Sequence, residues 1–461
     1  MSAPKSLFSK ENGIATNDMM SKADAQALCE RVVKLSKADS IGVNLGGGYT
    51  GNIRFAANRI STSGGVGNSQ LVVQSGYGSK HAVVTTGDFS PEGLERAVRQ
   101  SEAIAKLAPE DPDSMPNLPP QTYNTVNTYF ESTANLTPAE RAAAAHTAID
   151  ASKSAGDLAS AGFIVAGSSF NAIASNTGLF AYFPSTSANY QLTVRTNDGT
   201  GSGWAAADHP DWKQIDFKAV SDRAIEKARA SRNPVAVEPG RYTVILEPQA
   251  VGDLVQLLAF ALDARSADEG RSAFSKTGGG TKIGEKIVDS KVTLFSDPAD
   301  PQLLGQPWTG EGLPLGREVW IENGVLKQLA YSRFWAQKKG TRPNGGLGAV
   351  KMTGGDATRE QMIASTPRGI LVTRLWYLRQ VDPRTVLYTG LTRDGTYLIE
   401  NGKITKAVKN LRFNESPLFM LNNLEMAGRA ERVAGTEAGG NVVFPTIKVK
   451  DFNFTSLSDA V

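Results

Sequence analysis

The sequence predicts an α+β protein, with an N-terminal region of two similar helix–sheet–helix units followed by a mostly β C-terminal domain. Helix and strand patterns recur in the same order in the first half, which indicates a duplicated unit. Beyond residue 284, strand-like pieces alternate with turns. The 46 glycines among 461 residues favour strand-rich architecture over a helical bundle. We expect a tail at 1–21, α+β units at 22–120 and 121–234, and a mostly β domain at 235–461.

The first unit is expected to open and close with a helix. Ser90-Pro91-Glu92 supplies a capping hydroxyl, a proline at the first helical position and an early carboxylate. A glycine-rich turn is predicted between the first two strands, because residues on both sides of it have strand character. The expected order is helix 22–37, strands 40–45, 52–58, 70–74 and 81–85, and helix 90–108.

The second unit repeats this order after a Pro/Asp-rich linker at 109–120. Its first helix begins at Thr137-Pro-Ala-Glu140, which has the acidic residue of a capping box. The segment ending at Asn176 is similar to Arg54-Phe-Ala-Ala-Asn58, so 118 residues separate the two asparagines (176 − 58). The expected elements are helix 137–153, strands 162–166 and 190–194, and helix 217–230.

The C-terminal domain is predicted to begin with a strand and a long helix. Asn323-Gly324 and Asn401-Gly402 each lie between strand-like runs and predict β-hairpins. The expected elements are helix 248–264 and strands 242–246, 291–295, 318–322, 328–331, 369–375, 386–391 and 397–400.

Composition excludes several classes of protein. The net charge is only +3 and the basic residues form no stripe with interleaved aromatics, so we expect no nucleic-acid partner. No apolar run approaches the roughly 18 residues of a membrane helix, so we expect no membrane association. The first 20 residues lack the apolar core of a signal peptide, which predicts a cytoplasmic protein.

The residue types that bind metals are scarce and scattered. The three histidines, His81, His146 and His209, form no i, i+4 pair, and no Cys-x-x-Cys occurs. The single cysteine, Cys29, lies in an apolar helical pattern and is interpreted as a buried hydrophobic residue. We therefore predict no metal site in this chain.

Other motifs favour structural roles. The match of 46–51 to G-x-G-x-x-G is interpreted as a hairpin connection, since a strand and not a helix follows it. The run 277–284 contains a lysine but lacks P-loop spacing, and is interpreted as a mobile loop. Gly201-Ser-Gly203 has no nearby base. The acidic residues after the long helix are interpreted as a solvated loop, although a hydrolase using them is an alternative; they are Asp263, Asp268, Glu269 and Glu285.

The order of several motifs is similar to that of the TldD/PmbA family, from about residue 23 to 455. The resemblance is carried by Arg54-Phe-Ala-Ala-Asn58, the 198–204 glycine-rich segment, Gly240-Arg-Tyr-Thr-Val-Ile-Leu246, Ser272-Ala-Phe-Ser275 with Ile283-Gly-Glu285, and Ile321-Glu-Asn-Gly-Val-Leu326.

Catalytic chains of that family carry His-Glu-x-x-x-His on the helix before the Ala-Phe-Ser block, with a cysteine near the C-terminus as a further zinc ligand. Here Ala259, Phe260 and Ala264 stand where His, Glu and His would be, and residues 435–444 contain no cysteine. Alanine and phenylalanine offer no metal-binding atom. The chain therefore resembles the TldE/PmbA kind, which lacks the zinc motif.

That resemblance implies a non-catalytic subunit of a zinc metallopeptidase complex that cleaves unfolded or leader peptides. The partner would be a TldD-type subunit that holds the zinc, and this chain would hold no cofactor. Candidates for lining the substrate chamber are Arg265, Glu269, Gly278, Gly279 and Gly280. The alternative is a stand-alone or homodimeric peptide-binding or scaffold protein without peptidase activity.

Overall fold

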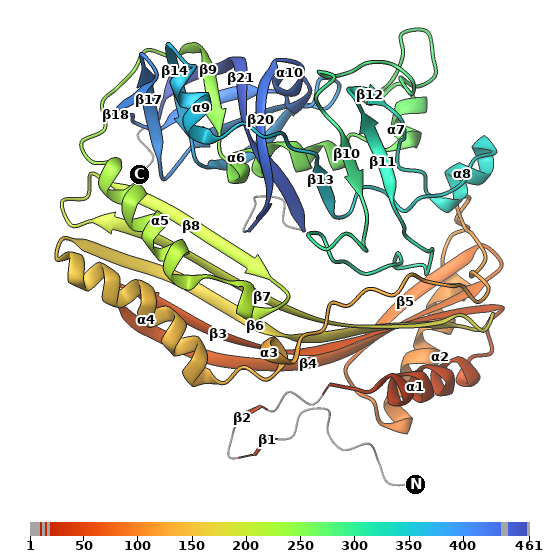
Figure 1. The fold of residues 1–461 in the computed structure, drawn as a ribbon. Helices are drawn as coiled ribbons and strands as arrows, with labels where there is room; N and C mark the ends of the chain where they lie inside the picture. The colour runs from red at the N-terminus through yellow and green to blue at the C-terminus, as the bar shows by residue number, and fades with distance from the viewer. Residues whose placement is uncertain (1–9, 12–13, 16–18, 435–440, 459–461) are drawn as a thin grey trace.

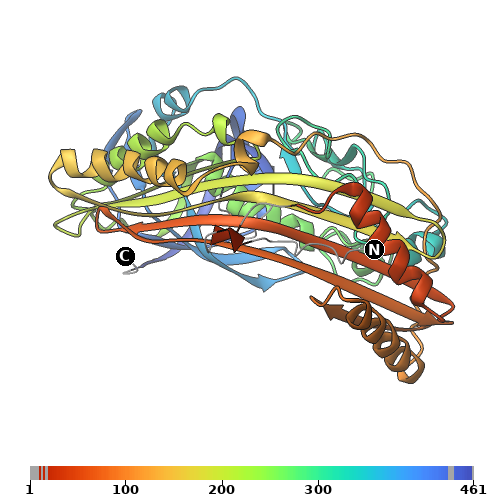
Figure 2. The same ribbon diagram turned by 90° about the horizontal axis from the view of Figure 1, so that it is seen from below.

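The computed structural model describes residues 10–11, 14–15, 19–434 and 441–458. It has two parts, a long curved sheet with helices and a second, β-rich part that packs above this sheet (Figure 1). Seen from below, the longest strands run across nearly the whole molecule (Figure 2). The predicted α+β class is confirmed.

The N-terminal sheet has six antiparallel strands in the order β5-β4-β3-β6-β7-β8. The first strands of the two units, β3 and β6, pair at its centre, so both units share one sheet. The strands are β3 (Ser40–Ala56), β4 (Arg59–Tyr77), β5 (Lys80–Thr86), β6 (Leu158–Ser175), β7 (Phe180–Thr196) and β8 (Ser202–His209). A separate two-stranded pair joins β1 (Lys10–Glu11) and β2 (Ile14–Ala15).

Helices cover one face of this sheet. On β3, Val43 packs in the cluster with α1 and α2, and Ile53 packs in the cluster with α4 and α5. Both residues are odd-numbered, so they point to the same face of the strand. The elements are α1 (Lys22–Leu35), α2 (Pro91–Leu107), α3 (Glu131–Ala134), α4 (Pro138–Ala155), η1 (Trp212–Gln214) and α5 (Phe217–Ala230).

Asn58 and Asn176, the two asparagines at equivalent positions of the repeat, make equivalent hydrogen bonds. Asn58, at the β3–β4 turn, bonds to the start of β6: its side chain donates to the Leu158 carbonyl at 2.7 Å and accepts from Ser160 N–H at 2.7 Å. Asn176, after β6, bonds to the start of β3, donating to the Asp39 carbonyl and accepting from Ile41 N–H. The duplicated unit is therefore also a pseudo-two-fold structural repeat.

The predicted turn at 46–51 is wrong, because these residues lie inside the 17-residue strand β3. The glycines serve close approach between strands. A Cβ at Gly48 would collide with the Ser168 carbonyl oxygen of β6, and one at Gly167 would collide with the Tyr49 carbonyl oxygen of β3. Gly48 and Gly167 thus let the two central strands come together.

The C-terminal part is built around β21 (Val442–Leu457), which pairs with β9, β13, β19 and β20. This sheet is mixed, because β13 and β21 run parallel, as do β9 and β14. Its other strands are β9 (Gly240–Leu246), β10 (Leu294–Ser296), β11 (Glu318–Glu322), β12 (Val325–Leu326), β13 (Val350–Met352), β14 (Arg368–Val372), β15 (Leu375–Asp382), β16 (Leu387–Thr392), β17 (Thr396–Glu400), β18 (Lys403–Ala407), β19 (Leu411–Glu415) and β20 (Leu424–Val433).

Both predicted hairpin turns are confirmed. Asn323-Gly324 joins β11 to β12, and Asn401-Gly402 joins β17 to β18. All four residues have positive φ, as a type I′ turn requires. The predicted strand at 328–331 is wrong, since these residues form no strand.

The predicted helix at 248–264 is correct only to Val255. The chain continues as a 3₁₀ turn and then becomes extended at Asp263, whose side chain accepts from Ser266 N–H at 2.7 Å and caps a new helix. A capping aspartate thus competes with continuation of the first helix. The helices are α6 (Pro248–Val255), η2 (Gln256–Phe260), α7 (Ala264–Asp268), α8 (Arg333–Lys339), α9 (Arg359–Ala364) and α10 (Pro417–Asn422). In the part of the chain that the structure describes, no helix is long and apolar enough to cross a membrane.

Substitution of Gly48 by alanine is expected to destabilise the protein by about 1–3 kcal/mol, because the added methyl meets backbone of β6 that cannot move aside. Gly64→Ala on the neighbouring strand is the matched control, since its Cβ would meet nothing closer than 3.7 Å. Chemical denaturation of both variants checks this. Equal stabilities would contradict the close-approach role of Gly48.

Candidate functional site

The segment aligned with the family's zinc motif has no metal-binding side chain at the three motif positions. Ala259 and Phe260 lie in η2, whereas Ala264 begins α7, so the segment from Ala259 to Ala264 is not one α-helix. Phe260 is 71% exposed, while Ala264 is fully buried in the C-terminal core. A histidine at position 264 would have to displace core side chains.

Arg265 of α7 and Glu269, the residue that caps the C-terminus of α7, lie one turn apart. Arg265 Nε donates to Glu269 at 3.0 Å, and the guanidinium also pairs with Asp113 of the linker. The guanidinium lies 5.2 Å from the ring centre of Trp335 on α8. The ion pair between Arg265 and Asp113 therefore joins the C-terminal part to the linker between the two N-terminal units.

The acidic residues near α7 form separate contacts rather than one cluster. Asp263 caps α7, and Asp268 binds Lys339 at 3.0 Å and the Trp335 indole N–H at 2.8 Å. Glu269 pairs with Arg265 and Arg271, and hydrogen bonds from Arg271 and then Arg265 lower its pKa. Glu285 pairs with Lys276 at 3.0 Å. This arrangement gives no pair of carboxylates suited to acid–base catalysis.

Gly278, Gly279 and Gly280 form an exposed tight loop. All three have positive φ, between 84° and 109°, and the loop closes through a Lys276 N–H to Gly280 carbonyl bond of 2.9 Å. Glycine is needed here for the backbone conformation. The predicted role of this loop in binding substrate stays a prediction.

The three histidines lie on different elements with different partners. His81 bonds Ser114 at 2.6 Å, His146 lies 3.6 Å from Asp150, and His209 Nδ1 accepts from Asp211 N–H at 2.9 Å. Burial, and then Arg432, lower the pKa of His209. Within residues 19–434 and 441–458, no three His, Cys, Asp or Glu side chains are arranged to hold a metal ion. The absence of a metal cofactor stays a prediction.

Cys29 matches its sequence interpretation. Its side chain is fully buried in α1, and burial raises the pKa of the thiol to about 12. Such a thiol is unreactive at neutral pH.

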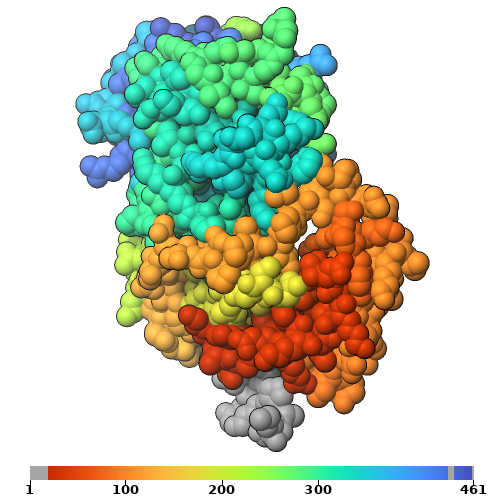
Figure 3. All heavy atoms as spheres, turned by 90° about the vertical axis from the view of Figure 1, so that its right-hand side faces the viewer, coloured from red at the N-terminus to blue at the C-terminus, as the bar shows by residue number. Residues whose placement is uncertain are grey.

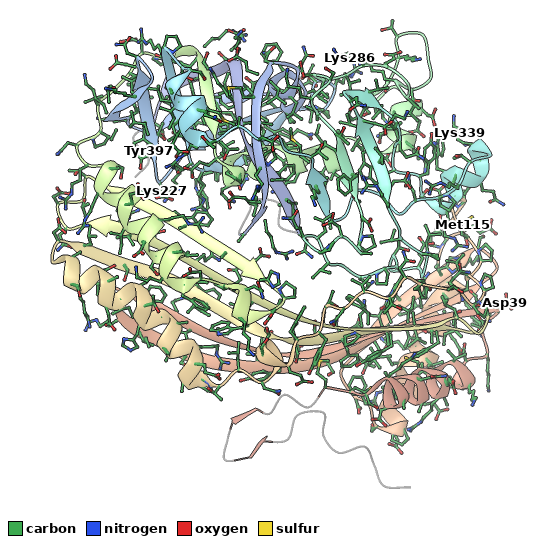
Figure 4. All side chains as sticks on the ribbon, in the orientation of Figure 1. Asp39, Met115, Lys227, Lys286, Lys339 and Tyr397 are labelled. Atoms are coloured by element: carbon green, nitrogen blue, oxygen red, sulfur yellow. The ribbon has the colours of Figure 1, made fainter. Side chains whose placement is uncertain are left out.

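A first cavity, of about 440 Å³, lies where the linker crosses between the sheet and the C-terminal part. Its lining includes Asn44 and Gln74 of the sheet, His81 with Ser114, and Arg333 of α8. Figure 3 shows this face hollowed where the orange segment passes the red strands. Met115, which also lines the cavity, and Asp39 lie at this side of the molecule in Figure 4. The cavity is polar and is open to solvent.

A second cavity, of about 410 Å³, lies at the other end, where α5 meets the C-terminal part. Lys227 of α5 binds Glu247 at 2.7 Å, and Arg359 of α9 binds the same carboxylate at 3.1 Å. Burial opposes ionisation of Glu247, but Lys227 and Arg359 outweigh it and lower its pKa. The Tyr397 hydroxyl donates to the Lys227 carbonyl at 3.1 Å (Figure 4). The sequence analysis missed this group, because its members are far apart along the chain.

The protein is thus an α+β fold of two parts, with polar cavities between the N-terminal sheet and the C-terminal part. A model of the PmbA/TldA metallopeptidase central domain matches residues 131–232, and a model of the C-terminal domain of the same family matches residues 239–456. Together these matches cover most of the chain. The chain belongs to the TldD/PmbA family of metallopeptidase-type proteins, which confirms the resemblance seen in the sequence.

Individual relatives share only part of their length with this chain. A metalloprotease of Methanothermobacter thermautotrophicus is 25% identical over 256 residues, or 52% of each protein. Metalloprotease PmbA of Escherichia coli O157:H7 is 24% identical over 173 residues, which cover 36% of this chain and 37% of that protein. The chain spans about half the length, or less, of the curated relatives it matches.

Solved structures match over nearly the whole chain. The crystal structure of TldE from Thermococcus kodakarensis has a TM-score of 0.82 and 19% identity, covering 93% of this chain and 99% of that chain. A Thermotoga maritima structure, described as a candidate modulator of a DNA gyrase, has a TM-score of 0.82 and 16% identity, covering 93% and 100%. At these identities the similarity shows the fold alone.

One buried carboxyl group lies apart from both cavities. Glu415 of β19 is 3% exposed and accepts from Ser416 N–H at 2.8 Å and Asn453 N–H at 3.1 Å. Burial raises its pKa to about 7, although both hydrogen bonds lower it. Its burial makes it a structural group rather than a catalytic one.

Glu415 should make stability depend on pH. The pKa of Glu415 is about 7 in the folded protein, against an ordinary value of 4.5. Its stabilising contribution to the free energy of unfolding is therefore complete below about pH 4.5 and is lost as the pH rises through 7. The expected loss is of order 3 kcal/mol, at 1.36 kcal/mol per pKa unit. Denaturation from pH 5 to 8 should show a steeper decline for the wild type than for Glu415→Gln. The exposed substitution Glu360→Gln is the control. Parallel curves for the wild type and Glu415→Gln would contradict the raised pKa.

Proposed function

We propose that this chain is the non-catalytic subunit of a cytoplasmic TldD/TldE-type zinc metallopeptidase complex that cleaves unfolded or leader peptides. The observation that carries the proposal is the occupation of the motif positions by Ala259, Phe260 and Ala264 in a member of a metallopeptidase family. None of these side chains can bind zinc or move a proton.

The local backbone supports the same proposal. The interval from Ala259 to Ala264 passes from a 3₁₀ turn through extended Asp263 into a second helix. Ala264 packs in the C-terminal core, and its N–H donates to the Ala330 carbonyl at 3.0 Å. The contacts of Ala264 are therefore those of a residue in the hydrophobic core. The zinc in the proposed complex would be held by a TldD-type partner.

The positions of the cavities support a role in enclosing substrate. Both cavities lie between the N-terminal sheet and the C-terminal part. On this side of the sheet, Ile173 and Phe183 pack against Trp308 of the C-terminal part. In the proposed complex this side would form part of a chamber wall, with Arg265, Glu269 and the Gly278–Gly280 loop as candidates to line it.

Metal content and peptidase activity test this function. We would measure both on an unstructured peptide, for this chain alone, for the His-Glu-x-x-x-His relative from the same genome alone, and for their mixture. Cleavage is expected in the mixture, with zinc in the relative, and this chain alone should bind no stoichiometric zinc. The mixture with a relative whose first motif histidine is replaced by alanine is the inactive control.

Two kinds of result would count against this function. Tight zinc binding by this chain alone, or cleavage without the relative, would place a metal or catalytic site here and contradict the proposal. No effect of this chain on the relative's activity would favour the stand-alone or homodimeric peptide-binding protein instead.

A further inference from the structure

The first half of β4 forms an unpaired sheet edge. β5 pairs only with Leu71–Tyr77 of β4, so within the described residues Arg59–Gln70 has one strand neighbour, β3. Residues 61–66 are exposed, and β2, which lies against β4, leaves them exposed. The register with β3 is regular from Thr62 to Gly76. In the part of the chain that the structure describes, the main chain of this segment is therefore open to a further strand.

The main-chain groups of odd-numbered β4 residues point outward, away from β3. In an antiparallel ladder a residue turns its N–H and C=O to the same side, and successive residues alternate. Ile41 of β3 bonds Asn176 on the β6 side through both groups, so odd-numbered β3 residues face β6 and even-numbered ones face β4. Asn52 lies opposite Gly64, so even-numbered β4 residues face β3 in turn. The outward residues of the free edge are Ser63, Gly65, Gly67 and Ser69.

This edge lacks the usual protection against added strands. Natural edge strands carry lysines, prolines or bulges, or are covered, because an open edge pairs with other chains. The outer strand β18 of the C-terminal sheet follows this rule, with Lys403 and Lys406 exposed. From Ile60 to Ser79, in contrast, the sequence has no charged residue and no proline. The free edge of β4 is thus suited to strand pairing, and it repels neither acidic nor basic chains.

The pseudo-two-fold repeat supplies an equivalent edge on β7. β8 pairs only with the second half of β7, so within the described residues the first half, like that of β4, has a strand neighbour on one side only. In the strands the two units are offset by 119 residues, the separation of the two close-approach glycines of the central strands (167 − 48). This offset places Pro184 and Thr186 of β7 at the positions of Gly65 and Gly67, in agreement with the pairing to the central strands.

An extended segment of the protein itself covers the equivalent edge of β7. Thr186 N–H donates to the Thr128 carbonyl at 2.9 Å, and the Thr128 hydroxyl donates to the Pro184 carbonyl at 2.8 Å. The covering segment, residues 121–130, forms no helix or strand of its own. The main-chain groups that it binds on β7 are those that Gly65 and Gly67 expose on β4. One of two equivalent edges therefore holds a piece of extended polypeptide, and the other is open.

We propose that the open edge of β4 binds an unfolded polypeptide segment in an extended conformation, through main-chain hydrogen bonds to residues 63–69. A strand added to a sheet edge is held by its main chain, whatever its side chains. Gly65 and Gly67 contribute no side chain that would select a sequence, and the edge carries no charge. Binding therefore depends little on the sequence of the peptide. In the proposed complex this peptide would be the substrate, and only that step rests on the proposed function.

Binding of a fluorescein-labelled peptide to the intact chain tests the proposal. The probe is a synthetic peptide with the sequence of residues 121–130, the segment that covers β7. We expect saturable binding by fluorescence anisotropy, and slower amide exchange over residues 61–70 when the peptide is bound. The same peptide with every main-chain nitrogen methylated should bind about tenfold more weakly, or worse, because it donates no main-chain hydrogen bond.

A substitution in the edge tests the same contact from the side of the protein. Ser63→Pro removes an outward N–H and should weaken peptide binding about tenfold or more, since proline cannot donate to an added strand. Pro184 of β7 shows that an outward position of this sheet accepts proline. Ser63→Ala is the matched control, because it keeps the N–H, and its affinity should change less than about twofold. The methylated peptide needs no variant, so the test holds even if Ser63→Pro misfolds.

Several results would overturn the edge site. They are the absence of saturable binding, binding that methylation of the peptide leaves unchanged, protection from exchange only outside residues 61–70, and a folded Ser63→Pro variant that binds as well as Ser63→Ala. The edge site and the proposed function can fail separately. If the peptide binds this edge but the mixture with the zinc-bearing relative cleaves nothing, the edge site stands and the proposed function is wrong. If the mixture cleaves and the edge binds no peptide, the proposed function stands and the edge site is wrong.

Discussion

The pairing of β3 with β6 at the centre of the sheet is the constraint on which the rest of the structure depends. Gly48 and Gly167 allow two main chains to approach where any side chain would collide. Asn58 and Asn176 then fix the ends of this pair to one another. Because the two units meet in this way, both helix pairs cover the same face. The other face is left to the C-terminal part, and each unit has an outer edge that must be covered separately.

Ionic contacts join the C-terminal part to the N-terminal part at both ends. Glu247 joins Lys227 of α5 to Arg359 of α9, and Arg265 joins the linker to α7. Lys227 and Glu247 of the first group are mostly buried, with side chains 17% and 13% exposed, so their charges depend on one another. The second is more exposed, and such pairs add little to stability. These contacts bound the polar cavities, and nearby Ala264 and Asp263 serve as a core residue and a helix cap.

Local signals in the sequence predicted much of the fold. The Thr137 capping box, the Asn323-Gly324 turn and the repeated asparagines were all recognisable, because each depends on residues close in sequence. Strand length was underestimated, since the glycines of β3 look like a turn until the partner strand is known. The partners of β21 and of Glu247 lie up to about two hundred residues away, and no local pattern reveals them. For the candidate site, the sequence did not reveal that Arg265 binds Asp113, which lies 152 residues away.

In the proposed complex, this chain contributes structure and no metal. Anomalous diffraction at the zinc edge, on crystals of the complex with the zinc-bearing relative, tests it most directly. We expect one anomalous peak for each copy of the zinc-bearing relative, inside that subunit, and none near Ala259–Ala264 of this chain. A zinc peak bound by side chains of this chain would contradict it.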